Sequence, residues 1–139
     1  MPENVLIYSR FPKALMVRIG ERFNLLDAAG KPPNELFGAD QLSGIRAMIT
    51  AGGTPLGADM MDLMPKLGAI VCYGTGYDGV DLAAAAKRKI TVGHSPGANA
   101  ASVADIAVTL MLATTRRLLV ADDYVRSGSW AGLDRKSVV

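Results

Sequence analysis

The stretch AIVCYGTGYDGVD, residues 69–81, is the most informative part of the chain for its fold. Its first five residues form a short apolar run with β-branched and aromatic members, which is typical of a buried strand. Glycines then interrupt the run, and Asp81 is expected to cap a helix over residues 81–89. A strand, a glycine turn and a helix N-terminus in this order present backbone N–H groups that can bind an anion.

The glycine spacing Gly74-x-Gly76-x-x-Gly79 also matches the fingerprint of dinucleotide-binding loops. That fingerprint requires an acidic residue about 20 positions further on, which binds the ribose hydroxyls. Here the next expected strand is followed by HSPGANAAS, and no acid occurs between Asp81 and Asp105. The sequence therefore favours a loop that binds a small anionic substrate over NAD binding by this loop alone. A glycine turn with no ligand is the remaining alternative.

The composition is that of a globular protein, since half of the 139 residues are apolar and a fifth are charged. The net charge of +2 is too small to indicate nucleic acid or an anionic membrane as a partner. The N-terminus, MPENVLIYSR, does not have the pattern of a signal peptide. The most apolar stretch, residues 103–114, carries Asp105 and is too short to span a bilayer.

The chain has one cysteine and one histidine. Cys72 lies within an apolar run and is expected to be a buried, inert thiol. No disulfide framework or metal cluster is expected, which agrees with a reducing cytoplasm. His94 follows an expected strand and has no carboxylate as a sequence neighbour, so a structural role is favoured over that of a general base.

Strand and helix patterns alternate along the first part of the chain. Strands are expected at residues 5–9, 24–27, 47–50, 69–73 and 90–93, and helices at 11–23, 34–42, 58–67 and 81–89. This α/β alternation with short connections predicts a parallel sheet with helices on both faces. Ligands bind at the carboxyl ends of such strands, where the glycine-rich loops 51–57 and 74–79 are both expected.

A long helical pattern covers residues 102–127, with Asn99 or Ser102 as its cap and Gly128 as its stop. Apolar residues cover nearly the whole circumference of this helix, which indicates burial on several sides. One small sheet cannot supply that burial. The sequence therefore predicts that the helix packs against a second domain or another subunit.

Residues 65–117, which begin PKLGAIVCYGTGYDGVD, resemble the N-terminal part of the D-isomer-specific 2-hydroxyacid dehydrogenases. The most specific elements are GTGYDGVD, the hinge SPGANAASVAD, the paired Arg116 and Arg117, and the ending VRSGSW. The resemblance extends over about residues 45–130, and residues 1–44 match in layout alone. The most similar members are hydroxypyruvate, glyoxylate and hydroxyphenylpyruvate reductases.

The resemblance implies a two-domain oxidoreductase. Residues 1–98 would form a flavodoxin-like substrate-binding domain, usually completed by a returning C-terminal segment. Residues 99–139 would form the hinge and the first helix of an incomplete Rossmann domain that binds NAD or NADP. In the family this helix commonly contributes to a homodimer interface.

The resemblance also implies a set of binding residues. In the family, the loop that matches residues 74–76 holds the substrate carboxylate with backbone N–H groups, and a second loop shapes the substrate pocket. The residues that carry over as substrate-binding are Gly52, Gly53, Gly74, Thr75 and Gly76. Val103 matches a position that touches the nicotinamide end of the cofactor.

The catalytic Arg, Glu and His of the family lie beyond the position that matches Val139, so no catalytic residue is assigned in this chain. It is expected to be a fragment of an NAD(P)-dependent enzyme that reduces a small 2-oxo acid to the D-2-hydroxy acid, and to be inactive by itself. The alternative is a non-catalytic α/β module that dimerises and binds a small carboxylate. Lys89 stands where the family often has a helix-ending glycine, so strain is expected there.

Overall fold

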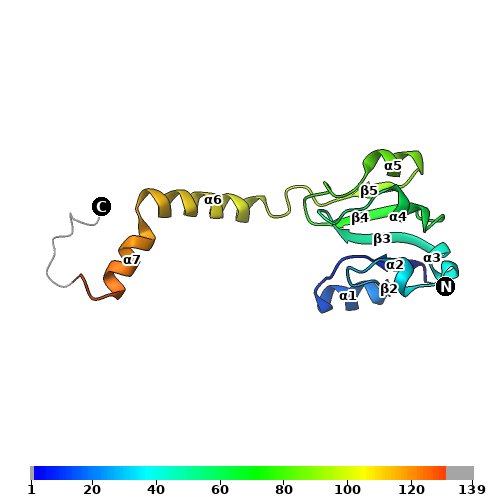
Figure 1. Cartoon of the computed structure of the whole chain (residues 1–139), viewed down its shortest axis with the longest axis horizontal. Coiled ribbons are helices and arrows are strands. Elements are labelled where there is room, and N and C mark those ends of the chain that lie inside the picture. Colours follow the sequence, from blue (N-terminus) through cyan, green and yellow to red (C-terminus); the bar gives the residue numbers. More distant parts are fainter. Residues whose placement is uncertain (1, 131–139) are drawn as a thin grey trace. The chain divides into compact units, whose positions relative to one another are not determined.

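A computed structural model describes residues 2–130 of the chain (Figure 1). The chain divides into two compact units, Met1–Ala98 and Asn99–Val139. The first unit contains all the strands among the described residues, and the second contains two helices. The last part of the predicted second domain, residues 131–139, lies outside the described residues.

The first unit is built on a five-stranded parallel sheet with the strand order β2-β1-β3-β4-β5. The strands are β1 (Asn4–Ile7), β2 (Asn24–Asp27), β3 (Ile45–Ala51), β4 (Ala69–Tyr73) and β5 (Thr91–Gly93). In the central pair, Ala47 of β3 lies opposite Ala69 of β4, and Ala51 lies opposite Tyr73. This strand order is that of flavodoxin-like folds, and it confirms the predicted parallel sheet.

The strands of the first unit are connected by short helices. These are α1 (Lys13–Gly20), α2 (Pro33–Leu36), α3 (Ala39–Ser43), α4 (Ala58–Asp62) and α5 (Leu82–Lys87). The single helix expected over residues 34–42 is wrong, because extended conformations at Phe37 and Gly38 divide it into α2 and α3. The helix expected over residues 58–67 is too long. Pro65 has no N–H and disfavours a helical conformation at the residue before it, so α4 ends early.

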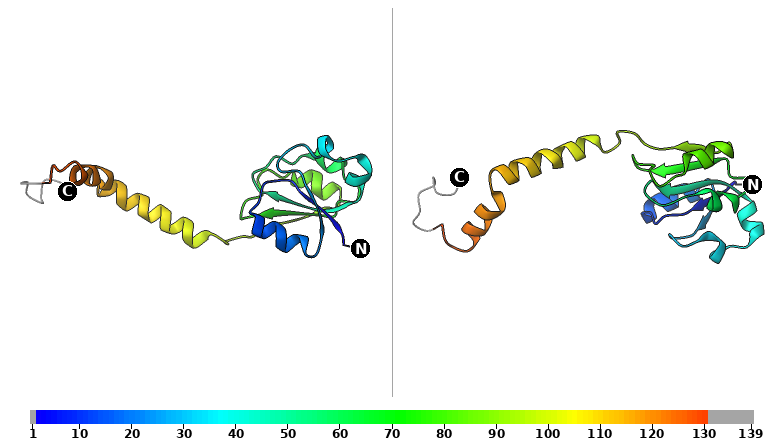
Figure 2. Two further views of the ribbon diagram at one scale, coloured as in Figure 1. Left: turned by 90° about the horizontal axis from the view of Figure 1, so that it is seen from below. Right: turned by 45° about the horizontal axis from the view of Figure 1, so that its top comes forward.

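Helices cover both faces of the sheet, as predicted, but they do so unequally. Helix α1 leads from β1 to β2, whereas the later connections cross the sheet in the opposite direction, so right-handed crossovers place α1 on the face opposite α4 and α5 (Figure 2). On the α1 side, Val5 and Ile7 of β1 are buried, but Val71 and Tyr73 of β4 are 45% and 55% exposed. The α1 face of the sheet is therefore partly open.

The opposite face carries the main hydrophobic core. Its members come from the strands, from α3, α4 and α5 and from the connecting loops, and they include Leu6, Leu26, Leu42, Ile45, Met48, Met61, Met64, Ile70 and Ala85. Cys72 lies in this core with 1% of its surface exposed, which confirms that the thiol is buried. This burial disfavours the thiolate and raises the pKa of Cys72.

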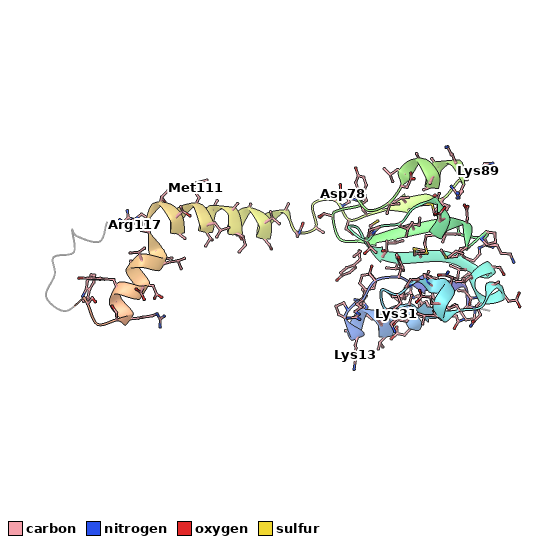
Figure 3. All side chains as sticks on the ribbon, viewed as in Figure 1. Lys13, Lys31, Asp78, Lys89, Met111 and Arg117 are labelled. Carbon is pink, nitrogen blue, oxygen red and sulfur yellow. The ribbon has the colours of Figure 1, made fainter. Side chains whose placement is uncertain are left out.

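Helix α5 is capped at both ends. The Asp81 carboxylate accepts a 2.8 Å hydrogen bond from the N–H of Ala84, which confirms Asp81 as the N-cap. Lys89, labelled in Figure 3, has a left-handed backbone with φ of +58°. The N–H groups of Lys89 and Ile90 donate to carbonyl groups in the last turn of the helix. This is a Schellman motif with lysine at the position that favours glycine.

The second unit contains α6 (Ala100–Thr115) and α7 (Leu118–Arg126). The single helix predicted over residues 102–127 is therefore wrong. Arg117, labelled in Figure 3, adopts a left-handed conformation with φ of +48°, and its N–H donates to the Thr114 carbonyl, so the first helix ends there. Gly128, with φ of +77°, follows α7 as predicted. Among the described residues, no helix has both the length and the hydrophobicity to cross a membrane.

Candidate carboxylate-binding site

Two loops meet at the carboxyl edge of the sheet because they follow neighbouring parallel strands. One loop connects β3 to α4, and the other connects β4 to α5. Leu56 and Val80 form an isolated parallel bridge between them. The N–H of Leu56 donates to the Gly79 carbonyl at 2.8 Å, and the N–H of Asp81 donates to the Leu56 carbonyl at 3.0 Å. The two predicted loops therefore form one hydrogen-bonded surface.

The backbones of these loops cross at two glycines. The N–H of Gly79 donates a 2.8 Å hydrogen bond to the carbonyl of Gly52. A Cβ atom added to Gly52 would lie 1.7 Å from the Gly76 carbonyl oxygen, and one added to Gly79 would lie 2.3 Å from the Thr54 carbonyl oxygen. Neither position can hold a side chain unless the backbone moves. In contrast, a Cβ on Gly53 would meet nothing within 4 Å.

This crossing bears on whether the loop could bind a dinucleotide. In dinucleotide-binding loops, glycines let the backbone approach the pyrophosphate closely and let the helix pack against the strand. Here the space beside Gly79 is filled by the backbone of Thr54 and Gly53. Gly79 therefore serves the packing of one loop on another, which differs from the helix–strand packing that the third glycine of a dinucleotide fingerprint permits. Glycine at positions 52 and 79 is explained by the packing of one loop on the other.

The segment from Gly74 to Gly76 has free donors and occupied acceptors. Gly74 has φ of +116°, a conformation that L side chains rarely adopt. Its carbonyl accepts a 2.8 Å hydrogen bond from the N–H of Ser95, and the Thr75 carbonyl lies 2.9 Å from Nδ1 of His94. Within residues 2–130, the N–H groups of Thr75 and Gly76 donate no hydrogen bond. Thr75 and Gly76 are half-buried residues, and their N–H groups can therefore bind an anion.

A cluster of hydroxyl groups, which was not among the residues predicted from the sequence, supports the first loop. The Ser9 hydroxyl lies 3.1 Å from the Thr50 hydroxyl and 2.9 Å from the Thr54 hydroxyl, and it accepts a 2.9 Å hydrogen bond from the N–H of Ala51. Ser9 and Thr50 are buried. Small hydroxyl residues at the ends of two apolar strands were the signal in the sequence that could have revealed this cluster. It connects β1 to both ends of the turn containing Gly52.

The remaining candidate residues lie as follows. The ring of His94 makes an edge contact with Tyr77, with ring centroids 4.8 Å apart. Val103 lies on α6 in the second unit and is 57% exposed, and its contact with a cofactor stays a prediction. Among residues 2–130, no group of three or more His, Cys, Asp or Glu side chains is placed to hold a metal ion.

A flavodoxin-like parallel sheet, with free N–H groups on loops at its carboxyl edge, defines an α/β domain suited to binding a small anion. The comparisons specify the class further. Residues 5–132 match the family model of the D-isomer specific 2-hydroxyacid dehydrogenase catalytic domain, and the chain belongs to this family. The members of this family are oxidoreductases. This confirms the resemblance seen in the sequence.

Individual relatives agree with this assignment. A glyoxylate reductase of Korarchaeum cryptofilum is 32% identical over 131 residues, which are 94% of this chain and 40% of that protein. The structure of a 2-hydroxyacid dehydrogenase from Ketogulonicigenium vulgare matches with a TM-score of 0.85 and 32% identity, over 96% of this chain and 43% of that one.

An NADPH-dependent glyoxylate/hydroxypyruvate reductase from Sinorhizobium meliloti, solved with NADP and malonate, matches with a TM-score of 0.79 and 29% identity. The match covers 94% of this chain and 40% of that one. The chain therefore spans about two fifths of the length of these relatives.

Proposed function

We propose that this chain is the substrate-binding part of an NAD(P)-dependent oxidoreductase that reduces a small 2-oxo acid to the D-2-hydroxy acid. Family membership supports the reaction class. Relatives named glyoxylate reductase and hydroxyphenylpyruvate reductase support a small 2-oxo acid of the glyoxylate or hydroxypyruvate type as the substrate. The observation that carries the proposal is the pair of free N–H groups of Thr75 and Gly76.

In this proposal the Thr75 and Gly76 N–H groups donate hydrogen bonds to the substrate carboxylate. Gly74 supplies the left-handed turn that precedes them, and Gly52 holds the neighbouring loop against them. Gly53 is exposed in the same loop as Gly52. A carboxylate held by fixed donors restricts the position of the adjacent carbonyl carbon, which is how positioning contributes to a transfer reaction. The nicotinamide, when bound, supplies the hydride.

In the proposed enzyme the two units would have different functions. The first unit would be the substrate-binding domain, and the second the start of the cofactor-binding domain, with Val103 near the nicotinamide. The exposed Val71 and Tyr73 support a further segment that covers the open face of the sheet. The exposed apolar residues of α6 and α7 support contact with the rest of the cofactor domain or with a second subunit. The chain alone is expected to be inactive, and a cytoplasmic location stays an expectation.

Carboxylate binding can be tested by titrating the ¹⁵N-labelled chain with pyruvate and following its amide resonances. We expect saturable shifts that are largest at Thr75 and Gly76. Pyruvamide, which has the same shape but no carboxylate, is the control and should produce no comparable shift. Equal shifts with the two compounds, or no response at these two amides, would contradict the proposed site.

A second candidate function is a non-catalytic module that binds a small carboxylate and dimerises, and the exposed helices of the second unit favour it. The mass of the polypeptide produced by its natural host distinguishes the two functions. A mass about twice that of the 139-residue chain or more would support a two-domain enzyme, and NAD(P)H-dependent reduction of glyoxylate by that protein would then be measured. A mass equal to that of this chain would favour the module.

A further inference from the structure

Two consecutive residues after β5 bind the carbonyl groups that flank the proposed carboxylate donors. The N–H of Ser95 donates to the Gly74 carbonyl at 2.8 Å, and Nδ1 of His94 lies 2.9 Å from the Thr75 carbonyl. A carbonyl oxygen can accept a hydrogen bond but cannot donate one, so Nδ1 of His94 carries the proton. Segment 94–95 thus bonds to two successive peptide groups of the 74–76 loop.

These carbonyl groups belong to the same peptide groups as the free donors. The Gly74 carbonyl shares a peptide plane with the N–H of Thr75, and the Thr75 carbonyl shares one with the N–H of Gly76. Each plane is rigid, and all described peptide bonds are trans, so the C=O and N–H groups of a plane point in opposite directions. A hydrogen bond to the carbonyl therefore fixes the direction of the N–H on the other side.

We propose that His94 is a positioning residue for substrate binding, and that it orients the N–H of Gly76 through the Thr75 carbonyl. The inference rests on the proposed function. The N–H of Ser95 orients the N–H of Thr75 in the same way, through the Gly74 carbonyl. As a backbone group, however, it is available whatever residue occupies position 95. The side chain of His94 is therefore the specific element. Without its bond, the peptide group between Thr75 and Gly76 would have greater freedom to rotate.

The His94 hydrogen bond also strengthens the Gly76 N–H as a donor. A hydrogen bond accepted by a carbonyl polarises its peptide group and makes the N–H of that group a stronger donor. The edge contact between the rings of His94 and Tyr77 limits the orientations of the imidazole, so Nδ1 stays near its acceptor. His94 itself is exposed, so replacing it should leave the core of the first unit unchanged.

Two substitutions separate hydrogen bonding from ring packing. His94→Phe keeps an aromatic ring that can contact Tyr77 but cannot donate to Thr75. His94→Asn loses the ring, but its side-chain amide places a donor close to the position of Nδ1. Each variant is titrated with pyruvate in the full chain, with amide shifts at Thr75 and Gly76 as the readout and thermal unfolding as the check of folding.

We expect His94→Phe to weaken pyruvate binding about three- to tenfold, the effect of losing one hydrogen bond, and His94→Asn to stay within about twofold of the wild-type chain. The opposite order, or equal affinity in both variants, would overturn the positioning role while leaving the proposed function intact. If the wild-type chain shows no pyruvate response, the proposed function fails, and the positioning role fails with it.

Discussion

At the scale of single residues, two adjacent glycines in the loop after β3 have different physical roles. Gly52 is buried where the two loops cross, with the Gly76 carbonyl in the space that a side chain would occupy. Gly53 is exposed, and a Cβ there would meet nothing within 4 Å. The sequence presents them as equivalent. The structure makes Gly52 a packing requirement and Gly53 a tolerant position.

We predict that Gly52→Ala lowers the free energy of unfolding by about 1–3 kcal/mol, because the added methyl group forces the backbones of the two loops apart. Gly53→Ala is the matched control and should change it by less than about 0.5 kcal/mol. Urea unfolding of both variants measures the difference. Equal stabilities would show that the loops do not cross closely at Gly52.

Lys89 is the second residue with an unusual backbone. A left-handed conformation brings its Cβ close to the following carbonyl oxygen, which costs about 1–2 kcal/mol for a residue other than glycine. The Schellman hydrogen bonds from Lys89 and Ile90 keep it there, and the buried Ile90 anchors the end of the motif in the core. The strain expected from the sequence therefore lies in the left-handed backbone of Lys89.

We predict that Lys89→Gly raises the free energy of unfolding by about 0.5–1 kcal/mol, since the strain removed exceeds the extra backbone entropy that glycine loses on folding. Lys89→Ala keeps the Cβ atom and removes the charge, so it should give no such gain. Thermal and urea unfolding compare the two variants. A gain with Ala equal to that with Gly would assign the effect to charge instead of backbone strain.

At the scale of elements, α5 connects the stability of the fold to the proposed site. Its N-cap, Asp81, ends the loop that contains Thr75 and Gly76. The other end of α5 is tied to α4 by Arg88, whose guanidinium forms two hydrogen bonds with the Asp62 carboxylate, at 2.7 and 2.8 Å. This pair is partly exposed and therefore stabilises the fold weakly. The Asp81 N-cap therefore contributes more to the stability of the fold than the Arg88–Asp62 pair does.

We predict that Asp81→Ala destabilises the chain by about 1 kcal/mol, the usual effect of losing an N-cap, whereas Asp81→Asn retains most of the stability. Asp78→Ala is the control, because Asp78 lies in the same loop and makes no cap hydrogen bond in the described structure; it should stay within about 0.5 kcal/mol. Urea unfolding provides the measurement. A loss with Asp78→Ala as large as that with Asp81→Ala would point to net charge, not capping.

At the scale of the whole molecule, each unit leaves apolar surface uncovered. In the first unit it lies on the open face of the sheet, around Val71 and Tyr73. In the second unit, the Val, Ile, Leu and Met side chains of α6 and α7 are all more than half exposed, and they include Val103, Ile106, Leu110, Met111, Leu118 and Leu119. Burying such side chains contributes about 1.5–3 kcal/mol each. This supports the proposed partner for the second unit.

We predict that the chain self-associates through α6 and α7, and that the double variant Ile106→Glu, Leu110→Glu is monomeric, because two charges would have to be buried in an apolar interface. Ser102→Glu is the control, because a negative charge is favourable in the first turn of a helix. Sedimentation equilibrium of the three chains reports the stoichiometry. A wild-type chain that is monomeric at every concentration would exclude a homodimer formed by this chain alone.

Much of this molecule could be predicted from local patterns. Alternating apolar runs and helix signals indicated the parallel sheet, and the bounds of β2 and β4 match the expected strands. The N-cap at Asp81 and the burial of Cys72 followed from the residue type and its immediate neighbours. The break between α6 and α7 at Arg117 could not be predicted in this way, because no glycine or proline marks it and the helical pattern continues through it.

The sequence by itself determined the fold class, the family resemblance and the two loops that carry the candidate site. Only the tertiary structure decided how those loops work together. The crossing of Gly52 and Gly76, and the bond from His94 to Thr75, join residues about 20 positions apart. Such contacts depend on which strands are neighbours and in what register they pair, and local propensity carries no information about either. The pairing of β3, β4 and β5 brings these backbone groups together and leaves the N–H groups of Thr75 and Gly76 free.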